Sequence, residues 1–371
     1  MPRSVSRSAE VVERWLDVAH LCRNHDVLVF GFGSTATDTA FELLLYRALR
    51  KRVIFVFHGS DARPPYLNEA RAPAGTAIDW EGLRAATHRV ARRMRRVEKY
   101  ADEVLAYPGI SHFFTRELVD WYAMGKPLLP FEFQQEPFTP PDPLGVHGGR
   151  PFRVGHAPTR RSTKGTDVLV QCVERLRDEG WNVELVLPDG MVARNQVLTL
   201  LSGCDVTVDQ FWADVPGPTL AAELAALGWP VIVGVREGDF FQETYPDRAA
   251  VMRFRDPNGV EDELRTLLEQ TAEAPDRRHL TEPFGDPTEV VADRYLSIFL
   301  GKDHTRWRFD PTEINRVFGF GPEERVKEIA AGYLQRFGSS ELMLDRRPAL
   351  RAVIEHYVTA GADHKALTPG E

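Results

Sequence analysis

The sequence predicts an α/β protein of two domains, each built on a doubly wound parallel sheet. The first observation is length, because 371 residues are more than one domain usually holds. The second is that short apolar strands alternate with helical segments through most of the chain, a pattern typical of parallel sheets. The third is a stretch rich in proline and glycine, residues 137–149, which is typical of a linker. We therefore expect a first domain over residues 1–140, a linker over 141–150, a second domain over 151–300 and a helical region over 301–371.

Composition narrows the class of protein. A hydrophobic content of 43% is enough for two cores, and a net charge of −8 argues against general nucleic-acid binding. No run of about 18 apolar residues predicts a transmembrane helix, and the first residues lack the apolar stretch of a secretory signal. The three cysteines share no metal-ligand spacing, so we expect free thiols in a reducing cytoplasm.

The first domain is expected to open with a helix over residues 9–23 and a strand over 26–30. The strand ends in Gly31 and Gly33, and a helix follows over 37–50. Glycines at a strand-to-helix turn let the backbone approach a ligand closely. A plain tight turn explains them equally well, and both readings stay open.

The clearest strand of the first domain covers residues 53–57 and is followed by His58-Gly-Ser-Asp61. Ligands bind outside the carboxyl ends of strands in open α/β sheets, so His58 is a candidate for contact with a substrate, with Asp61 beside it. A histidine that only caps the turn is the alternative.

A basic amphipathic helix is predicted over residues 84–99. Its apolar positions recur at helical spacing, and the others carry seven cations: Arg84, Arg89, Arg92, Arg93, Arg95, Arg96 and Lys99. We favour a solvated face, because long arginine side chains commonly lie over a core. Contact with an anionic membrane surface or with an anionic acceptor are the alternatives.

The second domain is expected to start with a strand over residues 152–155 and a basic loop. The loop contains Arg160, Arg161 and Lys164, and a helix begins near Gly165. Cations beside a helix N-terminus suit a diphosphate leaving group, because they neutralise the charge that grows as its bond breaks. A solvent-exposed basic loop is the less favoured alternative.

The stretch from Gly203 to Gly234 predicts a strand, a loop, a helix and a second strand. The loop holds Asp214 and Gly217, and the helix begins with Pro218 and Thr219. Free N–H groups and the helix dipole make this junction an anion site. Glu223 lies one turn further on the same face, where its carboxylate can accept sugar hydroxyls. Phosphate and hydroxyl binding together predict a nucleotide-sugar site.

This stretch resembles the donor-binding segment of GT-B glycosyltransferases of the retaining family 4 type. Residues 155–170 resemble that family's diphosphate loop, and residues 53–63 resemble its His-Gly-Ser-Asp turn. The resemblance implies a cleft between two Rossmann-like domains and transfer of a sugar from a nucleoside diphosphate sugar to an unidentified acceptor, with retention. It also implies that the donor is a substrate and that neither a cofactor nor a metal is required.

The resemblance implies a role for each matching residue. His58, Lys164 and Arg160 would serve transfer itself. The nucleotide-sugar would be held by Glu223, Gly217, Pro218, Thr219, Arg161, Gly165, Asp214, Gly31, Gly33 and Asp61.

The chain departs from the family pattern in two places. An earlier glutamate of the donor loop is absent, since its position holds Val215, with Asp214 before it. The first domain also looks short. These departures favour the alternative of a degenerate subunit that binds nucleotide or a partner enzyme without catalysing transfer. A nucleotide-sugar epimerase is a third reading.

Beyond residue 287 the chain is predicted to be helical, with apolar stripes over 326–337 and 350–357. In GT-B proteins a C-terminal helix returns to the first domain, and part of this region is expected to do so.

Overall fold

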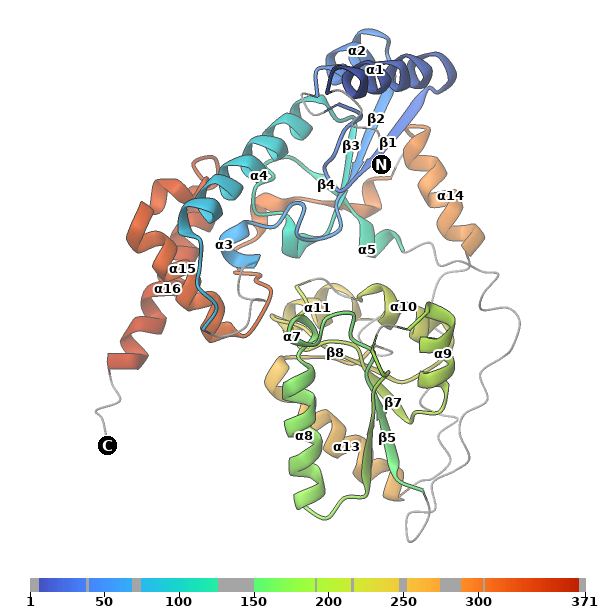
Figure 1. The fold of residues 1–371 in the computed structure, drawn as a ribbon, viewed down its shortest axis with the longest axis vertical. Helices are drawn as coiled ribbons and strands as arrows, with labels where there is room; N and C mark the ends of the chain where they lie inside the picture. The colour runs from blue at the N-terminus through green and yellow to red at the C-terminus, as the bar shows by residue number, and fades with distance from the viewer. Residues whose placement is uncertain are drawn as a thin grey trace, which may run out of the picture.

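The computed structural model describes residues 7–37, 40–68, 75–125, 150–190, 192–214, 217–246, 252–273, 288–302 and 304–366. They form two α/β domains, each with a five-stranded sheet (Figure 1). The predicted linker, residues 141–150, lies outside the described residues except for Arg150, which pairs with Asp205 at 2.7 Å.

The first sheet has the order β1-β2-β3-β4-β10. Its first four strands are parallel, and the last is antiparallel to β4. The strands are β1 (Val27–Gly31), β2 (Arg52–Val56), β3 (Glu103–Ala106), β4 (Leu118–Asp120) and β10 (Arg308–Phe309). The accompanying helices are α1 (Arg7–Asn24), α2 (Glu42–Ala48), α3 (Pro65–Asn68), α4 (Trp80–Tyr100), the 3-10 turn η2 (Pro108–Ile110) and α5 (Trp121–Met124).

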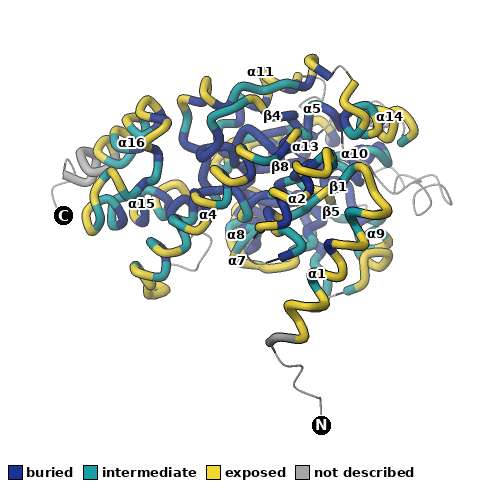
Figure 2. The backbone as a smooth tube through the Cα atoms, turned by 90° about the horizontal axis from the view of Figure 1, so that it is seen from above, coloured by how far each residue is buried: buried dark blue, intermediate teal, exposed yellow. Residues whose placement is uncertain are grey.

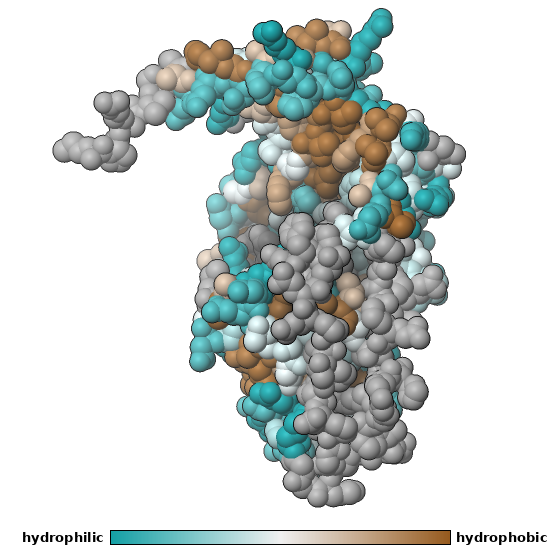
Figure 3. Space-filling view, turned by 90° about the vertical axis from the view of Figure 1, so that its right-hand side faces the viewer, coloured by the Kyte–Doolittle hydropathy of each residue, from teal (hydrophilic) through white to brown (hydrophobic). Residues whose placement is uncertain are grey.

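The sheet ends at β1, which has no further strand beside it among the described residues. The domain consequently exposes large apolar side chains on and near this edge. They include Val29, Phe32, Phe41, Leu44 and Leu49. Figure 3 shows apolar surface in the upper part of the molecule, where the first domain lies.

Helix α4 is amphipathic, as the sequence predicts. Asp79 caps its N-terminus by accepting a hydrogen bond from the Gly82 N–H at 3.0 Å. Its inner face buries Leu83, Thr87, Val90, Ala91, Met94 and Val97. Spacing of three and four residues puts these side chains on one stripe, which leaves the arginines to the other faces.

The second sheet has the order β6-β5-β7-β8-β9, and neighbouring strands pair in parallel. Its central strands are continuous apolar runs, because a parallel sheet is covered on both faces. The strands are β5 (Phe152–Gly155), β6 (Val183–Val186), β7 (Val206–Val208), β8 (Val231–Gly234) and β9 (Phe254–Arg255). The helices are α7 (Arg161–Lys164), α8 (Thr166–Asp178), α9 (Arg194–Ser202), α10 (Thr219–Ala226), α11 (Gly238–Thr244) and α13 (Val260–Glu273).

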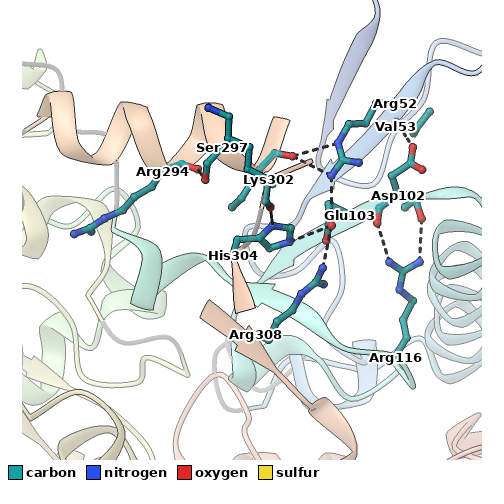
Figure 4. Close-up of polar contacts among 12 residues, drawn as sticks. Arg52, Val53, Asp102, Glu103, Arg116, Arg294, Ser297, Lys302, His304 and Arg308 are labelled. Atoms are coloured by element: carbon teal, nitrogen blue, oxygen red, sulfur yellow. Dashed lines mark hydrogen bonds and ion pairs between the residues drawn. The ribbon is translucent and has the colours of Figure 1, made fainter. Parts of the chain in front are cut away.

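The chain then returns to the first domain. Helix α14 (Thr288–Phe299) lies on the first sheet, where Arg52 donates a 2.9 Å hydrogen bond to the Ile298 carbonyl. Oε1 of Glu103 lies 3.0 Å from Nη2 of Arg308 and 3.1 Å from Nε2 of His304 (Figure 4). The expected boundary at residue 300 therefore falls inside the returning segment, and the region expected to be helical contributes strand β10.

The last helices pack against the first domain. Tyr66 of α3 stacks on Tyr333 of α15 (Glu323–Phe337) with ring centroids 5.1 Å apart. Glu341 follows α15 and binds Arg84 of α4 at 2.8 Å, and the Arg84 guanidinium, with help from His88, lowers the pKa of Glu341 to about 2. The apolar stripes predicted for α15 and α16 (Pro348–Ala366) are buried or partly buried. The outer faces of these helices and much of α1 are exposed (Figure 2).

Within the part of the chain that the structure describes, no helix is long and apolar enough to cross a membrane.

Candidate active site between the two sheets

The two sheets present their carboxyl ends to each other, which is where α/β proteins bind ligands. In Figure 1, α7, α10 and α11 lie at the end of the second domain that faces α5 of the first. The contact is close: a Cβ built on Gly109 of the first domain would come within 1.7 Å of the Asp214 carbonyl oxygen. Most of the residues that the sequence singles out follow strands at these facing edges.

A buried ion pair joins the two domains at this point. The Arg63 guanidinium donates from Nε and Nη2 to the two carboxylate oxygens of Asp214. Its remaining nitrogen, Nη1, donates to Asn68 Oδ1 at 2.7 Å. The Arg63 side chain is 4% exposed and the Asp214 side chain 0%. Asp214, predicted to bind the donor, is thus engaged by an arginine to which the sequence assigned no role.

His58 lies in an aromatic group of the first domain. Its ring centroid is 4.4 Å from that of Phe32 and 4.7 Å from that of Trp121, and the residue is partly buried. Asp61 caps the turn, because its carboxylate accepts the backbone N–H groups of His58 at 3.1 Å and of Gly59 at 2.7 Å. Asp61 therefore shapes the turn, and the sugar contact predicted for His58 stays a prediction.

Lys164 is held by a buried carboxylate that follows the neighbouring strand. Its Nζ lies 2.9 Å from Oδ1 of Asp209, whose side chain is 0% exposed. The other oxygen, Oδ2, is buried without a hydrogen-bond partner in the described structure. Gly165 ends α7 in the left-handed region (φ 77°), and a Cβ there would lie 2.7 Å from Phe211 Cβ. This close packing requires glycine and fixes Lys164 over Asp209.

The two arginines of the same loop are placed differently. Arg160 caps α7 and Arg161 begins it, and both are exposed to solvent. The structure therefore brings Lys164 to the second sheet while the two arginines remain on the surface.

His156 fixes the start of this loop. It is fully buried, with Nδ1 2.6 Å from the Val208 carbonyl and Nε2 2.9 Å from Thr166 Oγ1. Because the carbonyl can only accept, Nδ1 carries the proton and Nε2 accepts from the threonine. Burial lowers the pKa of His156, so the imidazole is neutral and ties β5, β7 and α8 together. Sequence reasoning assigned no role to this residue or to Asp209, although both directly follow strand ends.

Helix α10 carries the predicted nucleotide-binding residues. Thr219 begins it, whereas Pro218, which the sequence predicts in the first turn, has ψ 156° and is the N-cap. Glu223 lies in the buried face of the helix. Arg194 of α9 donates to Glu223 Oε1 at 2.6 Å. A ribose bound by this carboxylate would therefore share it with Arg194 or displace that side chain.

The N-terminus of α10 is covered by the first domain. Gly217 has φ 71°, and a Cβ built on it would lie 2.6 Å from the Tyr122 ring of α5. Tyr122 in turn packs edge-on against Tyr245, with ring centroids 4.9 Å apart, and Tyr245 donates to Asp120. The N–H groups predicted to receive phosphate are thus packed against a tyrosine in this arrangement of the domains.

Gly217→Ala is expected to destabilise the protein by about 1–3 kcal/mol, because it places a β-carbon at positive φ and against Tyr122. Thermal denaturation of the purified variant measures this. Gly180→Ala is the matched control, since Gly180 also has positive φ but nothing lies within 4 Å of its Cβ position. Equal losses in the two variants would contradict close packing of Tyr122 on Gly217.

The remaining predicted residues are Gly31, which ends β1, and Gly33, which follows it. Gly31 approaches His58, since a Cβ on it would lie 3.8 Å from His58 Nε2. Gly33 packs against Arg93 of α4 and lines a separate cavity. Among the described residues no group of three or more His, Cys, Asp or Glu side chains is arranged to hold a metal ion.

No protein-family model matches the chain, and no curated protein matches its sequence. Among solved structures, the chain is similar to one described as the "Glycotransferase of kitacinnamycin", with 15% sequence identity over 80% of each chain and a TM-score of 0.32. A TM-score this low defines neither fold nor activity.

Proposed function

We propose that the protein transfers a sugar from a nucleoside diphosphate sugar to an acceptor, with retention of configuration. The observation that carries the proposal is Lys164, held by the buried Asp209 at the carboxyl ends of β5 and β7, on the edge that faces the first domain. A cation fixed at this edge is placed to stabilise a departing diphosphate. The resemblance to retaining GT-B enzymes supports the stereochemical outcome.

In this proposal Lys164 and Arg160 bind the diphosphate, α10 presents backbone N–H groups to it, and Glu223 holds the ribose. The bond between the anomeric carbon and the diphosphate oxygen breaks, and a bond to the acceptor oxygen forms. The acceptor proton leaves with the diphosphate. His58 lies beside the transferred sugar, and the donor is a substrate, with no cofactor or metal proposed.

Donor binding at α10 requires Tyr122 to withdraw from Gly217. The two domains would therefore separate at this contact and close again around the substrates, a common form of domain motion. The Arg63–Asp214 pair lies at the same contact and would open with it.

A second candidate function is a nucleotide- or partner-binding subunit without transferase activity. A specific observation favours it: Arg63 engages Asp214, Arg194 engages Glu223, and Tyr122 covers Gly217. If these contacts are permanent, the predicted donor site stays closed.

A thermal-shift screen against UDP, GDP, ADP, CMP, dTDP and their common sugar conjugates tests the proposal. A ligand that binds only the folded state at 100 times its dissociation constant adds about 2.7 kcal/mol of stability. We expect a shift with one nucleotide that Glu223→Ala abolishes. Glu174→Ala, which changes an exposed glutamate of α8, is the matched control and should retain the shift. No shift with any nucleotide would overturn the transferase and leave the partner-binding subunit.

A further inference from the structure

The first domain contains a cavity that none of the predicted donor contacts in the second domain reaches. It has a volume of about 420 Å³ and lies between α4 and the loop that follows β1. Its apolar lining comes from Leu43, Phe55 and Val97, and the loop from Gly33 to Thr37 forms one side. This size is within the range of small-molecule sites.

The opposite wall of the cavity is made of arginines. Arg89, Arg92, Arg93 and Arg96 recur at helical spacing along one face of α4 and all line the cavity. No described carboxylate forms an ion pair with any of the four, whereas Arg84 on the same helix binds Glu341. Four like charges on one wall repel one another, and an anion would relieve that repulsion.

Arg93 is held in the wall by one hydrogen bond and keeps a second N–H group for a ligand. Its Nη2 donates to the Asp61 carbonyl, while Nε is buried and has no hydrogen-bond partner among the described residues. Burial lowers the pKa of Arg93, although Asp61 opposes this shift. Gly33 has φ 60°, and a Cβ on it would come within 2.9 Å of Arg93 Nε, so glycine is needed for this packing.

A buried carboxylate beside the loop, that of Glu42, binds the loop itself. Glu42 is fully buried and accepts the Thr37 backbone N–H at 2.7 Å and the Thr37 hydroxyl. It therefore holds the loop in place, and it forms no ion pair with the four arginines.

We infer that this cavity binds the phosphate group of a phosphate monoester whose adjoining part is apolar. Guanidinium groups match phosphate oxygens in pairs, and a dianion offsets more of the arginine charge than a carboxylate does. The apolar lining then receives the rest of the ligand.

The cavity lies near His58, because the Phe32 ring contacts that histidine and the next residue, Gly33, lines the cavity. A phosphorylated ligand here would be the sugar acceptor. That role rests on the proposed function, whereas the binding itself does not.

The test is calorimetric titration with phenyl phosphate in moderate salt, with inorganic phosphate as the second probe. We expect saturable binding that Arg89→Gln combined with Arg96→Gln weakens at least tenfold. Arg95→Gln, an exposed arginine of α4 outside this cavity, is the control and should bind within twofold of wild type. Absence of saturable binding, or an equal loss in the control, would overturn the inference.

Vesicles of phosphatidylglycerol and of phosphatidylcholine distinguish the source of the phosphate. Anionic vesicle binding that the double variant loses and Arg95→Gln retains would identify a lipid headgroup as ligand. Vesicle binding without phenyl phosphate binding would mean surface attraction alone and would overturn the site. The change in melting temperature caused by nucleotide, measured on the same double variant, reports on the donor site alone. A negative result at one site can therefore be told apart from a negative result at the other.

Discussion

Arg63→Ala is expected to lower the free energy of unfolding by about 3–5 kcal/mol, because it leaves the Asp214 carboxylate buried without its counter-charge. The Asp214 side chain is 0% exposed, and both of its oxygens accept from Arg63. Denaturant titration followed by two spectroscopic probes measures the change and shows whether the two domains unfold together.

Lys51→Ala is the matched control for this experiment. Lys51 pairs with Asp26 at 3.0 Å, but Asp26 is 97% exposed, so its loss should cost less than about 1 kcal/mol. Replacing both Arg63 and Asp214 by apolar residues should recover much of the loss, since no buried charge is then left alone. A loss from Arg63→Ala as small as that of the control would contradict a buried pair between the domains.

The position of this pair bears on function as well as stability. It joins the turn after β2 to the loop before α10, so the carboxylate expected to face the donor instead faces the other domain. A ligand that enters there has to compete with Arg63. If the protein is the proposed transferase, weakening the pair should favour the open arrangement of the domains. The loss in donor-binding free energy should then be smaller than the loss in the free energy of unfolding.

The parts that the sequence predicts well are those set by local pattern. The strands that precede His58 and end at Gly234 are apolar runs between polar turns, and α4 repeats its apolar residues at helical spacing. Helix α10 begins at Thr219, within one residue of the predicted start, and Pro218 is its N-cap. Each of these features depends on residues close together in the chain.

The parts that the sequence does not predict depend on residues far apart. Arg63 and Asp214 are 151 positions apart, and the sequence around each of them does not indicate which residue it pairs with. Strand β10 has two residues, too few for an alternating pattern, and α14 joins the first domain through contacts such as that of Arg52 with the Ile298 carbonyl. The arginines of the basic helix are largely exposed, as the favoured solvated face predicts. What the sequence does not predict is the cavity that four of them form with the loop after β1.

Lys164→Ala is expected to reduce turnover by about 10²–10³-fold, because it removes a fixed cation from the leaving diphosphate. The assay is release of nucleoside diphosphate from whichever donor the thermal-shift screen identifies. The same change also leaves Asp209 buried without its partner, which should lower the free energy of unfolding by about 3 kcal/mol. A slow variant could therefore be slow only because it is poorly folded.

The double variant Lys164→Met with Asp209→Asn separates the two effects. It removes the buried charge together with its partner, so stability should return toward wild type while turnover stays low. Asp209→Asn alone keeps the cation but releases its tether, and we expect an intermediate rate. If the stabilised double variant turned over at the wild-type rate, Lys164 would be a structural residue, and the diphosphate would have to be held by the exposed arginines of the same loop.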